Sequence, residues 1–427
     1  MILLSVVIAL FALVLFNVPI AVAVGAVAVA GILLSQGVDA LVNVPLKLFT
    51  GATNFPLIAI PLFIFAGALM NTTGLSQRLI AFVTALIGFV RGGLAMVNVG
   101  VSLFFAEISG SAVADVAATG TVLIPAMERR GYKKTFAAAL TSSSASLAII
   151  IPPSIPMILY GAIADTSVVQ LFVAGIVPGF LGGGLLMAFC YYYARKYDLP
   201  REQAFDLKHL WRAFKGAAWA LVLPIIILGG IFGGFVTATE GAGLAVVAAL
   251  GIGALIYREL SFKNLYRALV EAVIQTAVVM LLVATSAVLG LYLTEMQVPQ
   301  QLAAQILALT QNPYLVLGLL NVLLLVLGMF LHGAAAIILV VPIVLPLVHQ
   351  VGVDPVHFGL IVTLNLAIGQ QTPPVASVLA TACSIARADV WRTTQTNLPM
   401  IGVLLLVLLL VTYVPIIPLG LVQVFYP

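Results

Sequence analysis

The chain has 427 residues, of which 63% are hydrophobic and 7% are charged, and its formal net charge is +4. This composition excludes a soluble domain and is typical of a membrane protein with many spans. A net charge this small does not indicate a nucleic-acid-binding surface. We therefore expect no nucleic-acid partner. Cys190 and Cys383 lie in apolar segments and match no metal-ligand spacing. The N-terminus has no basic region, which indicates a retained membrane segment and not a cleaved signal peptide.

The first segments are apolar or amphipathic. Residues 2–34 are apolar, with an interruption at Asn17-Val18-Pro19, and their length leaves one or two spans open. A polar stretch at 35–54 precedes a predicted span at 55–70. The amphipathic stretch 72–91 suits a helix lying at the membrane interface.

Residues 92–127 are apolar at both ends, but their centre, AEISGSAVAD at 106–115, is small and polar. That centre cannot face lipid, so the segment forms either two short spans or a re-entrant hairpin. Arg91 precedes it, and Arg129, Arg130, Lys133 and Lys134 follow it. Basic residues at both ends favour a hairpin that enters from the cytoplasm.

A proline pair, Pro152-Pro153, interrupts the apolar stretch SSSASLAIIIPPSIPMILY at 142–160. Proline removes a helical hydrogen bond and pushes the residue before it out of the helical region. In a membrane the freed carbonyl groups need partners, so such a break is expected where the helix is buried in protein or lines a cavity. We therefore predict a broken transmembrane helix over 133–162, the element that holds substrates and ions in secondary transporters.

The later segments continue to alternate between apolar and polar. They are a span at 168–193, a polar loop at 195–215, spans at 217–236 and 241–257, a basic loop at 258–267, a span at 270–291 and an outside stretch at 295–311. A second hairpin follows at 314–348, with Gly328 and residues 331–336 at its tip, then a second broken helix at 357–386 and a last span at 396–424.

Prolines and glycines recur at a fixed spacing of 221 residues, as from Pro152 to Pro373. The matching positions are Pro125 and Pro346, Gly131 and Gly352, Pro153 and Pro374, and Pro178 and Pro399. This spacing predicts an internal repeat. Of the 18 Lys and Arg, all but Lys47 fall on the predicted cytoplasmic side, which gives the two copies opposite orientations and places the C-terminus in the periplasm.

The predicted fold is therefore an all-α polytopic membrane protein with two inverted repeats, each with a re-entrant helical hairpin and a broken transmembrane helix. Its expected parts are an N-terminal membrane segment with a scaffold role (1–54), the first repeat (55–194), a cytoplasmic loop with linking scaffold helices (195–269) and the second repeat (270–427).

Two constellations are candidates for cation sites. The first joins the tip Ser109-Gly110-Ser111 to residues 148–154, and the second joins 328–333 to 369–375, where Thr372 supplies a hydroxyl group. Carbonyl groups at the ends of half-helices suit a hard cation such as sodium, although close helix packing also explains small residues at hairpin tips. An anion could bind helix N-termini between the tips. The candidate lining residues are Ser111, Ser143, Ser154, His332, Asn365 and Gln371.

Glu107, Asp115, His332 and Glu240 are ionisable groups in apolar surroundings, where a functional role is the default hypothesis. A transporter coupled to protons through Glu107, Asp115 or His332 is the alternative to sodium coupling. The structural alternative is that Glu107 and Asp115 hydrogen-bond within the hairpin and that Glu240 caps a helix. An intramembrane serine protease would use Ser109 or Ser111 with His332, but it leaves the repeat unexplained. A pure scaffold leaves the polar tips unexplained.

Four blocks resemble the large membrane (M) subunit of TRAP transporters, a DctM-like member of the ion-transporter superfamily. They are AEISGSAVADVAATGTVLIPAMERRGY, IIIPPSIPMILYG, LGMFLHGAAAIILVVPIVLP and HFGLIVTLNLAIGQQTPPVASVL. The resemblance covers nearly the whole chain. It implies an elevator-type transporter of the bacterial inner membrane, without catalytic residues or cofactors, that imports an organic acid such as a C4-dicarboxylate or a sialic acid together with sodium. It also implies two protein partners, a periplasmic substrate-binding protein (P subunit) and a small four-helix membrane subunit (Q subunit).

The resemblance also carries over two sodium sites. The first comprises Ser109, Ala148, Ile151 and Pro152, and the second comprises Gly328, Gly369, Thr372 and Val375. Family members often have glycine where Ala148 stands, and an alanine carbonyl group can serve as the same ligand. Pro153 joins the candidates for substrate contact. Sodium is the only metal expected.

Overall fold

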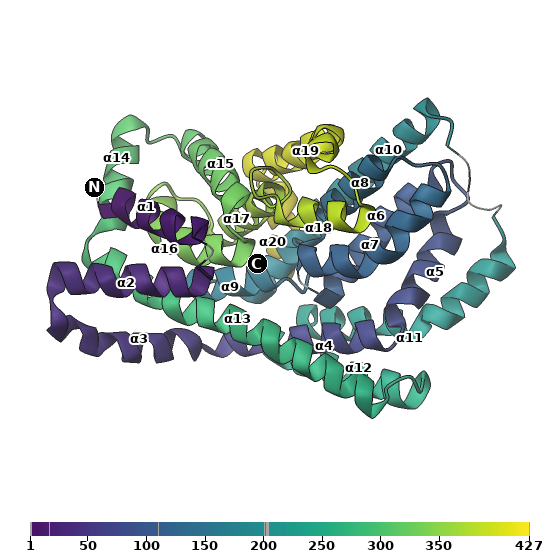
Figure 1. The fold of residues 1–427 in the computed structure, drawn as a ribbon, viewed down its shortest axis with the longest axis horizontal. Helices are drawn as coiled ribbons and strands as arrows, with labels where there is room; N and C mark the ends of the chain where they lie inside the picture. The colour runs from purple at the N-terminus through teal and green to yellow at the C-terminus, as the bar shows by residue number, and fades with distance from the viewer. Residues whose placement is uncertain (1, 17, 110, 200, 202–204, 427) are drawn as a thin grey trace.

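The computed structural model describes residues 2–16, 18–109, 111–199, 201 and 205–426, and within these ranges it contains helices and no β-strand. The side chains of residues 3, 4, 15, 76 and 105–109 lie outside the description. Figure 1 shows an elongated molecule in which many of the helices run roughly along the long axis. This arrangement confirms the predicted all-α class.

The longest helix, α13 (Phe262–Glu295), organises one side of the molecule. Its 34 residues extend over roughly 50 Å at the rise of an α-helix. Along it pack α2 (Ile20–Gln36), α3 (Asn43–Ala52) and α4 (Ala59–Thr72), as Figure 1 shows. Before them lies α1 (Ile2–Leu15), so residues 2–34 form two helices and not one.

The first hairpin consists of α6 (Gly93–Ser109) and α7 (Ala112–Arg129), which pack against each other. The broken helix follows as α8 (Lys134–Ala148) and α9 (Ile155–Ile163). With 15 and 9 residues, neither half reaches the roughly 20 residues that a membrane span requires. The amphipathic α5 (Leu75–Ile87) precedes the hairpin, and α10 (Val168–Lys196) follows the broken helix.

The second hairpin consists of α15 (Pro313–Phe330) and α16 (Gly333–Gln350), and the second broken helix of α17 (Pro355–Gly369) and α18 (Ser377–Ala386). Between α10 and the second hairpin lie α11 (Leu207–Phe232), α12 (Ala238–Gly251) with a π-helical turn (Ile252–Ile256), α13 and α14 (Val298–Leu309). The chain closes with α19 (Val390–Tyr413) and α20 (Ile416–Phe425).

The internal repeat is confirmed at the level of single residues. A shift of 221 residues places α7 on α16 and α8 on α17 with identical bounds. The repeats also pack reciprocally, because α7 lies against α18 while α16 lies against α9. The second helix of each hairpin thus packs against the second half of the other copy's broken helix. Such reciprocal contacts are those of two copies in a two-fold arrangement. The predicted inverted repeats therefore describe the fold.

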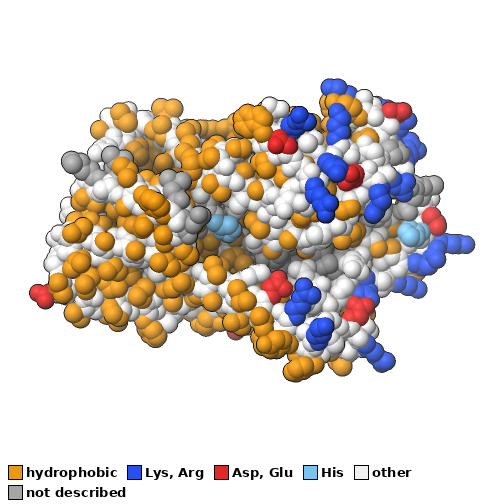
Figure 2. All heavy atoms as spheres, in the orientation of Figure 1, with side chains coloured by type: hydrophobic (Ala, Val, Ile, Leu, Met, Phe, Trp, Pro, Cys, Tyr) orange, Lys and Arg blue, Asp and Glu red, His pale blue; other side chains and the backbone are white. Residues whose placement is uncertain are grey.

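Eight helical segments of the described ranges are long and apolar enough to cross a membrane. They are 55–72, α10, α11, 238–256, α13, α15, α16 and α19. On the face that Figure 2 shows, Lys and Arg gather over one half of the molecule, while the other half has many hydrophobic side chains and almost no charged ones. This separation along the long axis agrees with the asymmetry of basic residues found in the sequence.

Four loop or span boundaries differ from the predictions. Helix α11 begins at Leu207 within the predicted loop 195–215, and α13 begins at Phe262 within the loop 258–267. The side chains of Asp206 and Ser261 cap these helices. The charged residues after each cap are therefore helical, although they lie outside the apolar part of the helix. The outside stretch 295–311 contains α14, and the last span, predicted at 396–424, is divided into α19 and α20 before Pro415.

Candidate functional site

The two helix breaks share one backbone geometry. In the first, the Ile151 amide donates to the Ala148 carbonyl oxygen at 3.0 Å. At the matching place in the second, the Thr372 amide donates to the Gly369 carbonyl oxygen at 2.8 Å. Each break therefore begins with a tight turn at the end of a 15-residue half-helix, where the negative end of the helix dipole lies. This is an environment of carbonyl oxygens that suits a hard cation.

The residues of the second predicted sodium site lie close together. A Cβ atom at Gly369 would stand 2.5 Å from the Gly328 Cα atom, so the backbones of α17 and α15 touch there. The Val375 amide donates to the Met329 carbonyl oxygen at 3.3 Å, which ties the break to the hairpin tip. The Thr372 hydroxyl donates to the Ile368 carbonyl oxygen at 3.0 Å, which leaves its lone pairs available.

The first predicted sodium site is described in part. Ala148 and Ile151 are buried and pack together against Leu103 of α6, and Pro152 is buried beside them. The Ser109 side chain and Gly110 lie outside the described residues. Helix α10 closes on this break at Gly175, where an added Cβ atom would stand 2.0 Å from the Ile150 carbonyl oxygen. Both breaks thus depend on glycine for a close backbone approach.

A buried polar network joins the second break to α8 and α19. The Ser143 hydroxyl lies 2.7 Å from both the Gln371 Oε1 atom and the Asn397 Oδ1 atom, and the Asn397 amide donates to Gln371 at 3.0 Å. The Asn365 amide donates to Asn321 of α15 at 2.7 Å. These side chains hydrogen-bond with polar groups of other helices, so their bonds connect the helices.

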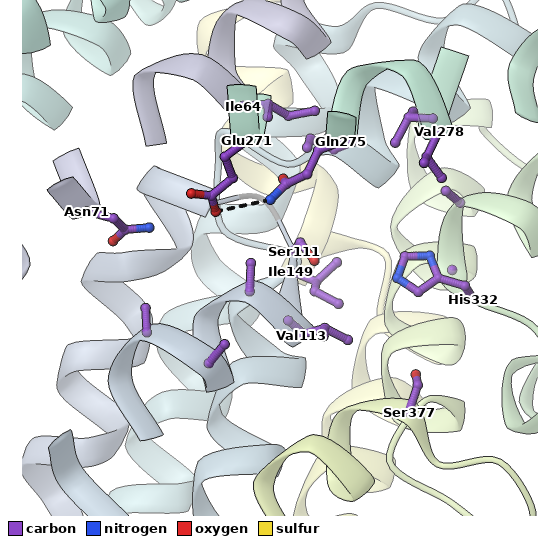
Figure 3. Close-up of a pocket in the computed structure, with 18 of the residues that line it drawn as sticks. Ile64, Asn71, Ser111, Val113, Ile149, Glu271, Gln275, Val278, His332 and Ser377 are labelled. Carbon is purple, nitrogen blue, oxygen red and sulfur yellow. Dashed lines mark hydrogen bonds between the residues drawn. The ribbon is translucent and has the colours of Figure 1, made fainter. Parts of the chain in front are cut away.

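A cavity of about 960 Å³ lies where both hairpin tips and both breaks meet. Figure 3 shows Ser111 of the first tip and His332 of the second directed into it. The first break contributes Ile149 and the second contributes Gln370. Helices α7 and α16 both begin at this cavity, so their first amide groups and positive dipole ends lie at its wall.

Of the seven predicted substrate residues, Ser111 and His332 line this cavity, whereas Ser143, Pro153, Ser154, Asn365 and Gln371 do not. The Ser154 hydroxyl accepts the Met157 amide at 3.4 Å and caps α9. The cavity also has polar lining residues outside the predicted constellations, and these are Asn71, Gln77, Thr121, Arg267, Glu271, Gln275 and Ser377. Glu271 and Gln275 lie one turn apart in α13, within the predicted span 270–291, and the Gln275 amide donates to the Glu271 Oε1 atom at 3.4 Å, a bond that Figure 3 marks with a dashed line. That polar pair was a detectable signal.

The ionisable candidates have different environments. Glu240 forms a capping box with Thr237, whose amide donates to the Glu240 Oε2 atom at 2.8 Å, so the prediction of a helix cap is confirmed. The Glu107 side chain lies outside the described residues, and Asp115 is 1% exposed. Within the described ranges no three His, Cys, Asp or Glu residues are grouped as metal ligands.

A family model described as "Tripartite ATP-independent periplasmic transporter, DctM component" matches residues 7–417. The chain belongs to this DctM family. Membership confirms the expected resemblance, and it makes the chain a transporter component and not an enzyme.

Curated relatives cover most of this DctM chain. It is 43% identical over 405 residues to the isethionate TRAP transporter permease protein DctMQ of Oleidesulfovibrio alaskensis, with 94% of this chain and 63% of the relative covered. It is 37% identical over 383 residues to the C4-dicarboxylate TRAP transporter large permease protein DctM of Pseudomonas aeruginosa, with 90% of both covered. The sialic acid permease SiaT of Haemophilus influenzae is 37% identical over 369 residues, covering 86% of this chain and 60% of SiaT. The chain thus spans under two thirds of the DctMQ and SiaT proteins.

Among solved structures, the YdaH transporter of Alcanivorax borkumensis matches with a TM-score of 0.65 at 16% identity, and 90% of each chain is covered. The crystal structure of that transporter reveals an unusual topology. At this identity the likeness supports the fold alone.

Proposed function

We propose that this DctM chain is the large permease of a sodium-coupled system that imports an organic acid across a bacterial inner membrane. The observation that carries the proposal is the cavity shared by two hairpin tips and two helix breaks. Helices α7 and α16 begin at its wall, and helix N-termini favour negatively charged groups. The substrates named for the relatives, isethionate, C4-dicarboxylates and sialic acid, all carry an acidic group that is ionised at neutral pH.

Sodium binds at the two breaks in this proposal. The first site uses Ser109 with the backbone of Ala148, Ile151 and Pro152, and the second uses Gly328, Gly369, Thr372 and Val375. The equivalent turns at Ala148 and Gly369, which gather carbonyl oxygens at half-helix ends, support this assignment. Bound cations next to the cavity would balance the charge of an acidic substrate.

The transport cycle is of the elevator type in this proposal. The two hairpins and two broken helices carry the substrate, and the helices α2, α3, α4 and α13 form the scaffold along which they move. The cavity wall supports this division, because hairpin residues such as Ser111 lie on one side and α13 residues such as Glu271 on the other. A periplasmic substrate-binding protein delivers the substrate, a small four-helix membrane subunit completes the scaffold, and the C-terminus lies in the periplasm.

The deciding experiment is uptake into proteoliposomes that contain this chain with its partner subunits. Labelled isethionate, a C4-dicarboxylate and sialic acid are each offered with a sodium gradient or with potassium in its place. We expect uptake of one of these acids in sodium and none in potassium. Equal uptake in both salts would refute sodium coupling and favour the proton-coupled alternative.

A matched pair of variants tests the second sodium site. Thr372→Val removes a hydroxyl at the break, whereas Thr381→Val removes one that makes the same kind of bond, to the Ser377 carbonyl oxygen at 2.9 Å, within α18. We expect Thr372→Val to raise the half-saturating sodium concentration and Thr381→Val to leave it unchanged. Ser109→Ala makes the corresponding test of the first site.

A further inference from the structure

Asp115 is a buried acid that the proposed transport mechanism does not use. It lies in the first turn of α7, and it is 1% exposed. Neither of its carboxyl oxygens has a hydrogen bond, and no Lys or Arg of the described ranges forms an ion pair with it. A buried carboxylate without such partners costs several kcal/mol. The group therefore requires a bound ion or a proton.

A chain of buried hydrogen bonds ends beside this carboxyl group. The Ser102 hydroxyl of α6 lies next to Asp115 and is 3.0 Å from the Ser144 hydroxyl of α8. Ser144 lies 3.0 Å from the Asn98 Oδ1 atom, and the Asn98 amide nitrogen is 2.7 Å from the Thr141 hydroxyl. All of these side chains are fully buried.

The direction of the chain follows from counting protons. The Thr141 hydroxyl donates to the Ala137 carbonyl oxygen at 2.8 Å, so it accepts from Asn98. The Ser144 hydroxyl has one proton, and its two acceptors are the Asn98 Oδ1 atom and, at 3.2 Å, the Thr141 carbonyl oxygen. The Asn98 amide nitrogen is also 3.7 Å from the Met127 sulfur, a weak acceptor that fits this orientation of the amide.

Because the Ser144 proton is used, the contact between the two serines has Ser102 as its donor. Ser102 then presents only lone pairs to Asp115. An ionised carboxylate would face these lone pairs and be repelled, whereas the proton of a carboxylic acid is attracted to them. We propose that Asp115 is a proton-binding site within the first hairpin, held as a neutral acid beside the lone pairs of Ser102.

The second repeat supports a specific role for this acid. The position equivalent to Asp115 is Ala336, which is fully buried in the second hairpin. A hairpin of this architecture therefore packs without an acid at this place. Ser102 likewise corresponds to Leu323, so the acid and its acceptor occur together in one copy only.

The other charged groups near α7 do not replace the proton. Helices α6, α8 and α18 pack against it. From α8 comes Lys134, whose amine is 3.1 Å from Glu128, roughly 20 Å along α7 from Asp115. From α18 comes Cys383, which is buried. From α6 comes Glu107, whose side chain lies outside the described residues.

A proton held by Asp115 makes transport depend on pH, even though protons do not drive transport. Asp115 lies one turn from Ser111, the tip residue at the cavity, and the Asp115 amide donates to the Ser111 carbonyl oxygen at 2.9 Å. Removing the proton places an unpaired charge directly behind the tip. We therefore expect transport to be lost as the pH rises and Asp115 ionises.

Uptake by the complete system is measured in proteoliposomes over a pH series, at saturating sodium and substrate. We expect the wild-type rate to fall toward alkaline pH, approaching tenfold per pH unit once the acid form is the minor one. Asp115→Asn supplies a permanently neutral amide donor and is expected to remove this decline. Asp206→Asn, which changes an exposed helix cap to another good capping residue, is the control and keeps the wild-type profile.

Ser102→Ala tests whether Ser102 presents lone pairs to Asp115 and does not require the Asp115 variant to fold. Removing an acceptor of the acid proton moves the alkaline decline to lower pH, whereas removing a donor to a carboxylate moves it to higher pH. The second result would overturn the proposal. An unchanged alkaline decline in Asp115→Asn would overturn it as well, and a raised half-saturating sodium concentration in that variant would identify Asp115 as a cation ligand instead.

Discussion

Gly369→Ala is expected to weaken both the fold and the second sodium site. The new Cβ atom would stand 2.5 Å from two backbone atoms of Gly328 and 3.0 Å from the Met329 amide nitrogen. Ordinary contacts of this kind begin near 3.4 Å. Because the neighbours are backbone atoms, no side-chain rotation relieves the clash, and α15 must move away from α17 by nearly 1 Å.

The expected loss of stability in Gly369→Ala is the difference between two opposing free energies. Overpacking of a close contact costs about 1–3 kcal/mol. Replacing glycine by alanine within a helix returns roughly 0.5–1 kcal/mol. A net loss of about 1–2 kcal/mol is expected, and the same loss at the site would raise the half-saturating sodium concentration by roughly tenfold.

The assay compares thermal unfolding in detergent with sodium-dependent uptake in proteoliposomes. Gly402→Ala is the matched control, because a Cβ atom at Gly402 in α19 meets nothing within 4 Å. That variant is expected to be as stable as the wild type or slightly more stable. If Gly369→Ala matches Gly402→Ala in stability and in sodium dependence, the close contact between Gly328 and Gly369 does not hold the second site.

Three further predictions concern other parts of the chain. Asn397→Ala removes one of the two side chains that hydrogen-bond the Gln371 Oε1 atom, the other being Ser143, and is expected to lower the free energy of unfolding by about 0.5–1.5 kcal/mol, measured by denaturation in detergent. The Arg78 guanidinium hydrogen-bonds Glu259 at 3.0 Å and lowers the pKa of that carboxyl group, so the pair stabilises the fold above the ordinary pKa of Glu and loses this effect as the pH falls through the lowered pKa. Because the pair is partly exposed, Arg78→Gln is expected to cost less than about 1 kcal/mol at neutral pH and nothing in acid, as thermal unfolding at both pH values would show. His332→Ala is expected to change substrate half-saturation in uptake assays, and loss of a proteolytic activity in this variant would instead favour the serine protease hypothesis.

The repeat could be predicted from the sequence because its signals are local. Proline pairs, glycines after the hairpins and small polar tips each impose a backbone conformation wherever they occur. The shift that aligns Pro152 with Pro373 also aligns the helix bounds of α8 and α17. The helix extensions at Leu207 and Phe262 were missed, because charged residues were assigned to loops although they continue a helix beyond the apolar core.

The lining of the cavity was less predictable, because it depends on which face of each helix meets a neighbour. Ser143 and Gln371 belong to the broken helices and are polar, as Ser111 at the hairpin tip is, yet they bond with each other and with Asn397. Periodicity does not distinguish these cases, since a polar side chain in a membrane helix is satisfied by a ligand or by another helix. Glu271 lies far from both repeat motifs in sequence, and only the packing of α13 brings it to the cavity.

The two repeats share a backbone but differ in the chemistry they place on it. At the start of the break, one copy has Ala148 packed on Leu103, and the other has Gly369 in contact with the backbone of Gly328. Behind the tip, one copy has Asp115 and the other has Ala336. Symmetry of the backbone therefore provides two equivalent turns, while the side chains make them unequal. We infer that the two predicted cation sites differ in affinity and that ionisation of Asp115 acts on the first hairpin alone, since the equivalent position of the second hairpin is Ala336.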